Sequence, residues 1–171
     1  MVIFLSKKIK CSILLLAVFI LTGCAEDKSG PKKLGYEIVE SIKNRNLKAY
    51  LEKFITFEEK KFLIYRSTLT SEQIREQLSY IVDGENENIR RIDDREMNFN
   101  DICSHGNWSG AKINKIFLGH KYEDNGHVEY ENIVIEFKKD ILPDLQIDGV
   151  VQVRDYWKIK DDEALSFRSR I

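Results

Sequence analysis

Two pairs of residues in this sequence combine a chemically active type with a spacing that lets them act together. His120 and Glu131 lie on either side of Asn125-Gly126, the preferred pair for a tight β-turn, and a two-residue turn there places them opposite each other on the side of the hairpin that faces the core. A histidine beside a carboxylate at a pocket mouth is suited to general acid–base catalysis. The same two residues can also form an ordinary polar contact between strands near the end of a sheet, and we favour this interpretation.

Cys103 and His105 form the second pair, and a thiol near an imidazole can act as a nucleophile. One such pair in a polar stretch is weak support for catalysis, so we interpret Cys103 as a thiol without a chemical role. A metal site needs three or four converging ligands, and the spacing of the histidines, cysteines and acids offers none. The sequence therefore predicts neither a metal nor a cofactor.

The beginning of the chain carries an export signal. Lys7, Lys8 and Lys10 precede residues 11–21, which are apolar except for Ser12. This run is shorter than the roughly 20 residues of a membrane-spanning helix, and a basic start with a short apolar run is typical of a signal peptide. It ends in the residues LTGC at positions 21–24, which resemble the lipobox of bacterial lipoprotein precursors.

This resemblance implies that the Cys24 thiol receives a diacylglycerol and that cleavage removes residues 1–23. The protein is then expected to be exported and anchored to a bacterial membrane, with residues 24–33 as the lipidated cysteine and a polar tether. Residues 25–33 reach at most about 30 Å when extended at roughly 3.3 Å per residue. Ala25, where an Asp would favour the inner membrane, implies the periplasmic face of the outer membrane if the cell is Gram-negative.

The charge balance argues against nucleic acid as a partner. The whole chain has 27 basic and 28 acidic residues. Residues 1–23 contain three lysines and no acid, so the processed chain has 24 basic and 28 acidic residues, a net charge of −4. The two signs are mixed, without the basic stripe that binds nucleic acid. The processed chain of 148 residues has the length of one domain, which we expect to span residues 34–171.

Helical spacing dominates the first half of this domain. Two apolar stripes follow the tether, namely Leu34, Ile38 and Ile42, and then Leu47, Tyr50, Leu51 and Phe54. Asn46 is positioned to cap the second of these helices. Thr56 and Glu59 form a predicted capping box that opens a helix ending near Arg66. Residues 70–84 predict a further helix with a stripe of Ile74, Leu78 and Ile81 and with Gly84 after its end.

Residues 85–111 are polar, and we predict a long loop there with a short edge strand at residues 88–93. Long loops in compact domains often carry function. Phe99 and Trp108 are the large apolar residues of this segment that suit a partner-binding anchor. For Trp108 we keep a second interpretation open, in which its side chain closes the end of the sheet.

From Ala111 the apolar spacing changes to the alternation of β-strands. Outward pairing from the Asn125-Gly126 turn places Ile116 opposite Ile135 and Leu118 opposite Ile133. A further strand is predicted across residues 149–160, and a last one contains Leu165 and Phe167. Asp155 shares the inward parity of Val151, Val153 and Trp157, so we expect it to pair with an arginine or to mark a pocket. Helices followed by a β-meander predict an α+β fold.

A resemblance to a known superfamily accompanies this order of elements. The segment YEIVESIKNRNLKAYLEKF, a further helix ending in YIVDG and late strands carrying VQVRDYWKI resemble the NTF2-like/cystatin-like superfamily, and in particular its small lipoproteins. The resemblance implies amphipathic helices packed on a curved antiparallel sheet, often with a cone-shaped pocket. That superfamily contains enzymes, binding modules and interaction domains, so the fold assigns no function.

Three functions are compatible with these observations. The first is a membrane-tethered binding or protein-interaction module of the cell envelope, whose further partner is a protein or a small ligand. The second is an immunity- or exclusion-type lipoprotein that blocks a toxin, a phage or a conjugation partner. The third is an enzyme of the NTF2-like kind, with His120, Glu131 and Asp155 lining its pocket. The absence of converging catalytic groups in the sequence favours binding.

The lipid anchor gives the first testable prediction. Replacing Cys24 by Ser removes the thiol that would carry the lipid, so we expect an unprocessed precursor that takes up no label from a clickable palmitate analogue. A Cys103→Ser variant is the matched control and keeps the label. Labelling that persists after Cys24→Ser contradicts the lipobox assignment.

Overall fold

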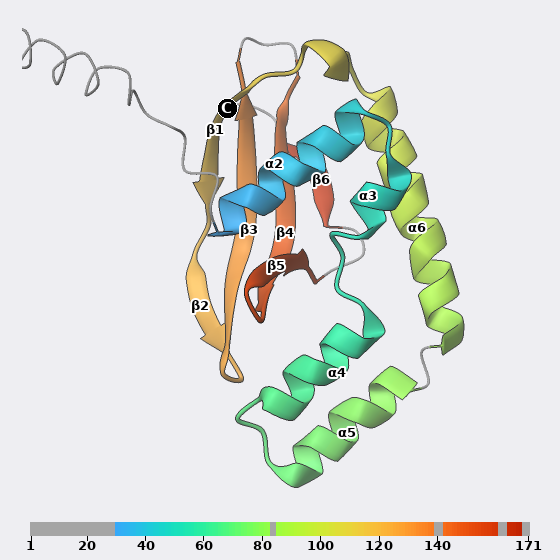
Figure 1. Ribbon diagram of the computed structural model, residues 1–171, viewed down its shortest axis with the longest axis vertical. Coiled ribbons are helices and arrows are strands. Elements are labelled where there is room, and N and C mark those ends of the chain that lie inside the picture. The colour runs from blue at the N-terminus through green and yellow to red at the C-terminus, as the bar shows by residue number, and fades with distance from the viewer. Residues whose placement is uncertain (1–29, 83–84, 139–141, 161–163, 169–171) are drawn as a thin grey trace, which may run out of the picture.

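The computed structural model describes residues 30–82, 85–138, 142–160 and 164–168 (Figure 1). The predicted signal peptide, Cys24 and Gly84 lie outside these residues. Within the described ranges, no helix is both long enough and apolar enough to span a membrane.

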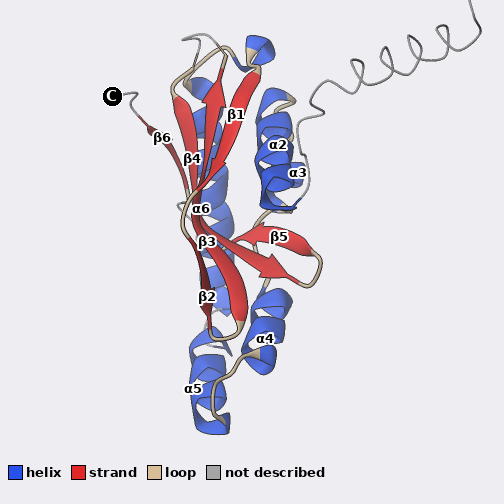
Figure 2. Cartoon of the chain, turned by 90° about the vertical axis from the view of Figure 1, so that its left-hand side faces the viewer, coloured by secondary structure: helices blue, strands red, loops and turns tan. Residues whose placement is uncertain are grey.

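Helices precede strands, and the predicted α+β fold of helices on an antiparallel sheet is confirmed. The helices are α2 (Gly30–Lys43), α3 (Leu47–Leu51), α4 (Phe57–Arg66), α5 (Ser71–Val82) and α6 (Glu85–Ser104), followed by the 3-10 turn η1 (Trp108–Gly110). The strands are β1 (Ile113–Leu118), β2 (Lys121–Asp124), β3 (His127–Phe137), β4 (Asp144–Val153), β5 (Tyr156–Ile159) and β6 (Leu165–Arg168). Figure 2 shows α2 and α3 on one side of the sheet.

The strand order in the sheet is β1-β3-β4-β5, with β2 also paired to β3 and β6 paired to β4. All of these pairs are antiparallel. β5 pairs with residues 150–153 of β4, whereas β6 pairs with residues 144–147. The last strand thus returns to β4 instead of extending a simple meander.

The hairpin around Asn125-Gly126 has the predicted register. Both turn residues have positive φ, 49° at Asn125 and 84° at Gly126, as a type I′ turn requires. Ile116 pairs with Ile135, and Leu118 pairs with Ile133. Two irregularities interrupt the strand beside β3: a register shift at residue 114, and a gap at residues 119–120 between β1 and β2.

The main core lies between α2 and the sheet. The predicted stripe of Leu34, Ile38 and Ile42 is buried, at 3%, 0% and 1% exposure. Gly35 allows this close approach, because a Cβ there would lie 3.1 Å from Ile116 Cδ1. The helix begins at Gly30, so residues 30–33 belong to it and not to the predicted tether.

The prediction of a loop at residues 85–111 is wrong, and so is the edge strand at residues 88–93. Most of the segment is the helix α6. Phe99 and Ile102, three residues apart on one helical face, are buried at 4% and 1% exposure. Few apolar residues mark this helix, and the apolar spacing was therefore too sparse to predict it.

Polar side chains supply much of the contact that α6 makes with the rest of the domain. Asn98 accepts a hydrogen bond from the Tyr50 hydroxyl at 2.9 Å and donates one to the Leu165 carbonyl at 3.1 Å. The Arg95 guanidinium lies 4.4 Å from the ring centroid of Phe54. A polar sequence can therefore form a core-facing helix when its polar groups find partners.

Trp108 is not an exposed anchor, and the alternative in which it closes the end of the sheet is confirmed. It is 5% exposed and packs edge-on against Phe137, with the ring centroids 5.6 Å apart. Its indole N–H donates to the Ile102 carbonyl at 2.9 Å. That carbonyl belongs to the last turn of α6, where main-chain acceptors lack partners within the helix. Trp108 therefore closes the core and caps α6.

The single strand predicted across residues 149–160 is instead the β4–β5 hairpin. Arg154 and Asp155 form its turn, and Asp155 is exposed. The turn reverses the chain, so the parity that placed Asp155 inward does not continue across it. Asp155 lines neither of the two cavities described below, and no ion pair of its side chain is found within the described part of the chain.

Replacing Trp108 tests its role in stability. Trp108→Ala should lower the free energy of unfolding by about 3–5 kcal/mol, as truncation of a buried aromatic does. Trp108→Phe keeps most of the ring but removes the indole donor, so the Ile102 carbonyl keeps only the His105 N–H at 3.2 Å, and we expect a cost of about 0.5–1.5 kcal/mol. The measurement is urea-induced unfolding followed by circular dichroism.

The matched control is Tyr65→Ala, which removes an aromatic side chain that is 63% exposed. We expect it to change stability by less than about 0.5 kcal/mol. Equal losses for Trp108→Ala and Tyr65→Ala would contradict the structural role of Trp108.

Candidate functional site

The helices α4 and α5 form an antiparallel pair, the α4–α5 hairpin, at the end of the sheet where β2 turns into β3 (Figure 1). Hydrogen bonds between residues close in the sequence define the N-terminal ends of both helices. Thr56 and Glu59 form the predicted capping box of α4, with Glu59 N–H donating to Thr56 Oγ1 and Glu59 Oε2 accepting from Thr56 N–H. Thr70 and Gln73 make the same reciprocal bonds at α5. The hairpin is thus well specified by its own residues.

Apolar burial attaches this hairpin only lightly to the sheet. No residue of α4 is fully buried, and the described side chains of α5 are at best half-buried. The predicted apolar stripe of Ile74, Leu78 and Ile81 is half-buried. Phe62 and Leu63 pack against a small cluster of Ile55, Val151 and Val153 that is separate from the main core.

A polar network joins the start of α4 to β5. The Tyr156 hydroxyl donates to Glu59 Oε1 at 2.9 Å, and Lys158 Nζ lies 3.5 Å from the same oxygen. Burial alone would raise the pKa of the Glu59 carboxyl. The hydrogen bonds from Thr56 and Tyr156 and the charge of Lys158 outweigh it, and they lower this pKa below its usual value.

A second attachment joins the end of α4 to the tip of the β2–β3 hairpin. His127 Nε2 lies 2.6 Å from the Leu63 carbonyl oxygen, so the ring donates there. The Thr68 N–H donates to the Asn125 carbonyl at 3.0 Å. The β2–β3 turn therefore holds the connection between α4 and α5 in place.

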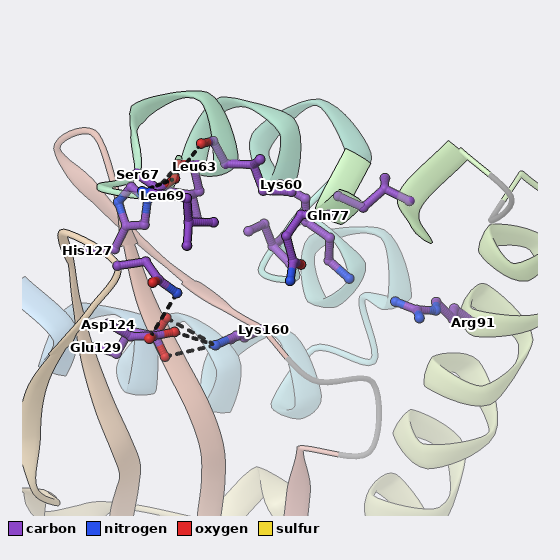
Figure 3. A pocket seen from close by; sticks show the side chains of 14 residues that line it. Lys60, Leu63, Ser67, Leu69, Gln77, Arg91, Asp124, His127, Glu129 and Lys160 are labelled. Atoms are coloured by element: carbon purple, nitrogen blue, oxygen red, sulfur yellow. Dashed lines mark hydrogen bonds and ion pairs between the residues drawn. The ribbon is translucent and has the colours of Figure 1, made fainter. Parts of the chain in front are cut away.

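Beside the second attachment lies a cavity of about 500 Å³, which we call the hairpin cavity (Figure 3). Its apolar lining comes from Ile55, Leu63, Ile64, Leu69 and Ile81. Its polar lining comes from Lys60, Ser67, Gln77, Arg91, Asp124, Asn125, His127, Glu129 and Lys160. The residues come from α4, α5, α6, the β2–β3 hairpin, the segments on either side of α4 and the end of β5, so the tertiary fold brings them together.

Glu129 is the most buried polar group of this cavity, at 3% exposure. Its carboxylate accepts from Lys160 Nζ at 3.0 and 3.1 Å and from the Tyr122 hydroxyl at 3.0 Å. Asp124 Oδ2 lies 3.9 Å from the same ammonium group, as Figure 3 shows. The ion pair with Lys160 compensates the buried negative charge of Glu129. The Lys160 side chain itself is half-exposed and lines the cavity with its ammonium group.

His120 and Glu131, the predicted pair, are joined by a backbone hydrogen bond, and no contact between their side chains is found. The Glu131 N–H donates to the His120 carbonyl at 2.9 Å, which confirms that the two residues are opposite. Both side chains are exposed, so the expected core-side position is wrong. The His120 ring stacks on Tyr122, with centroids 6.3 Å apart. Neither residue lines the hairpin cavity.

Cys103 and His105 do not form a nucleophile pair. Cys103 is buried, its thiol faces the Ile42 carbonyl at 3.9 Å, and burial raises its pKa. A raised pKa lowers the thiolate fraction and therefore the reactivity. His105 is exposed, and its Nδ1 lies 2.7 Å from the Asp101 carbonyl oxygen.

His127 and Lys160 were not predicted from the sequence as cavity residues. Glu129 has the same parity along β3 as the buried Ile133 and Ile135, and a carboxylate at such a position was a usable signal. No comparable pattern marks Lys160, which is brought to Glu129 by the fold. Within the described residues, no group of three or more histidine, cysteine or acidic side chains is arranged to hold a metal ion.

Comparison of the chain with protein-family models, with curated proteins and with solved structures finds no match. The geometry of the hairpin cavity and the sequence are therefore the basis of the functional argument.

The network around Glu59 predicts a pH dependence of stability. Because its folded pKa is lowered relative to about 4.3 in the unfolded chain, the carboxylate stabilises the fold above that pH. This contribution is lost as the pH falls through the folded pKa. Glu59→Gln preserves the capping box, and we expect it to cost roughly 1 kcal/mol at neutral pH and progressively less as the pH falls toward about 2. Urea unfolding across this pH range provides the measurement.

Glu58→Gln is the neighbouring control. Its side chain is 79% exposed and pairs only with Lys61, at 3.4 Å, among the described residues. An exposed pair of this kind contributes little, so stability should change by less than about 0.5 kcal/mol at either pH. A Glu59→Gln loss that does not shrink in acid would contradict the assigned role of its charge.

Proposed function

We propose that this protein is a ligand-binding module of the bacterial cell envelope, tethered to a membrane through Cys24, and that it binds its ligand in the hairpin cavity. The observation that carries the proposal is a cavity of about 500 Å³ whose lining combines five apolar residues with nine polar ones. Small-molecule sites commonly have roughly 300–1,000 Å³, with apolar surface for contact and polar groups that fix the orientation of the ligand. The ligand that fits is an amphipathic small molecule, with its apolar part against α4 and α5.

The arrangement of polar groups supports binding over catalysis. Glu129 and Lys160 are committed to each other, and His127 is committed through Nε2 to the Leu63 carbonyl. Catalysis needs a nucleophile or base with a free path to the reacting atom and a donor for the developing charge. Glu129, Lys160 and His127 thus have fixed partners within the protein, which suits the orientation of a bound polar group.

The tether and the family remain part of the proposal. The LTGC residues ending at Cys24 support lipid attachment, and the short polar segment after them supports a position near the membrane. The order of helices and strands supports membership of the NTF2-like/cystatin-like superfamily. The space between α2 and the sheet is filled by the core, so the proposed ligand site lies beside the α4–α5 hairpin instead.

A protein partner, as for an immunity- or exclusion-type lipoprotein, is the second candidate. It is favoured by Tyr65 on α4 and Tyr80 on α5, which are 63% and 68% exposed. Tyrosine is enriched among the few residues that contribute most of the binding energy at protein–protein interfaces. In the native host, a Tyr65→Ser/Tyr80→Ser double variant that loses protection while retaining small-ligand binding would favour this candidate.

Occupation of the hairpin cavity can be tested with the anionic, amphipathic probe 1-anilinonaphthalene-8-sulfonate. Gln77 is exposed on α5 and lines the cavity, so Gln77→Trp adds an indole to the cavity without removing core contacts. We expect saturable binding by the native protein and affinity weakened at least about tenfold by the variant, since an indole covers roughly 150–250 Å² of surface. Equilibrium dialysis measures both affinities without interference from the added fluorophore.

Ser79→Trp is the control, because Ser79 is also exposed on α5 but does not line the cavity. Both variants should melt at the temperature of the native protein. Equal affinities for the probe in Gln77→Trp and in the native protein would exclude the hairpin cavity as the binding site.

A further inference from the structure

A second cavity, of about 300 Å³, adjoins the β4–β5 turn, and we call it the arginine cavity. It shares Leu63 and His127 with the hairpin cavity, and its other lining residues are Phe62, Arg66, Gly126, Val128, Gln152 and Arg154. Neither of its two arginines, Arg66 and Arg154, was predicted from the sequence as a site residue. They lie 88 positions apart in the chain, one at the end of α4 and one in the turn after β4.

The guanidinium groups of both arginines lie near the same aromatic ring, that of Phe62. The Arg154 guanidinium lies 4.7 Å from the centroid of Phe62, and that of Arg66 lies 5.7 Å from it. The lining residues that the structure describes include no carboxylate. Neither arginine forms an ion pair within the described ranges. Two like charges near one ring, without a paired acid, form a site of positive potential.

The backbone at Arg154 gives an independent indication of function. Its φ is +57°, in the left-handed region that Gly and Asn normally occupy at hairpin turns. An arginine there costs conformational energy that glycine would avoid. Strained positions of this kind are concentrated at functional sites. The side-chain amide of Gln152 donates to the Arg154 carbonyl at 3.1 Å and holds this turn conformation.

We propose that the arginine cavity binds the phosphate group of a phosphomonoester, with Arg66 and Arg154 as its ligands. Two guanidinium charges match the charge of about −1.5 to −2 that a phosphomonoester carries at neutral pH. The planar donor fork of arginine matches phosphate oxygens in a bidentate geometry. A volume of about 300 Å³ equals roughly ten water molecules, so a small substituent on the phosphate also fits.

Two sources can supply this group: a soluble organic phosphate, or the headgroup of a lipid such as phosphatidic acid. The chemistry at the arginines is the same for both. The full-length protein in non-ionic detergent micelles can be offered either source, as glycerol 3-phosphate in solution or as phosphatidic acid within the micelle. Phosphatidylcholine in the same micelles is the control, because it is a diester without a net charge.

The experiment is isothermal titration calorimetry in a phosphate-free buffer. We expect one saturable site for glycerol 3-phosphate or for micellar phosphatidic acid, and none for phosphatidylcholine. Arg154→Gly and Arg66→Gln should each weaken binding at least about tenfold, as expected for the loss of a charge-assisted hydrogen bond. Arg154→Gly also relieves the strained φ, so its melting temperature should stay the same or rise.

Arg45→Gly is the matched control, since Arg45 also has a positive φ, of 50°, and is exposed but lies in the turn after α2. It should keep the native affinity for the phosphomonoester. Absence of saturable binding to both phosphomonoesters, or native affinity in Arg154→Gly, would overturn the proposal. Gln77→Trp does not alter the arginine cavity, so failure of the hairpin cavity as a ligand site leaves this test unaffected.

Discussion

The register of β3 is the constraint on which the rest of the structure depends. Positive φ values at Asn125 and Gly126 fix how β3 pairs with β1 and β2. One half of the strand then directs Ile133 and Ile135 into the core under α2, and the other half presents His127 to α4. A slip by one residue would turn every side chain to the opposite face. The same turn therefore determines the core and the wall of the hairpin cavity.

The α4–α5 hairpin combines strong local specification with weak attachment. Its capping boxes define both helices, whereas its contacts to the sheet are a few polar bonds, such as that from His127 to Leu63, and one small apolar cluster. Segments with little buried apolar surface open more readily than the core around them. A ligand that touches both the hairpin and the sheet would stabilise their closed arrangement, because it binds only when the two surfaces are together.

Features encoded by neighbouring residues could be predicted from the sequence, and features created by distant ones could not. The capping box of Thr56 and the type I′ turn at Asn125-Gly126 are local, and both were predicted. Helix α6 was missed because Asn98 and other polar residues make contacts that apolar spacing does not reveal. Asp155 was misplaced because one strand was assumed where the chain turns. Lys160 is brought to the hairpin cavity only by the tertiary fold.

The irregular strand beside β3 has a consequence for how copies of this protein behave when crowded. β1 and β2 lie at an edge of the sheet, where unpaired backbone groups can recruit a strand from another molecule. The register shift at residue 114 and the gap at residues 119–120 divide this edge into short pieces, and Lys115 and Lys121 add exposed charges to them. Such an edge is a poor template for intermolecular sheets. Molecules concentrated on a surface could therefore remain separate instead of aggregating edge to edge.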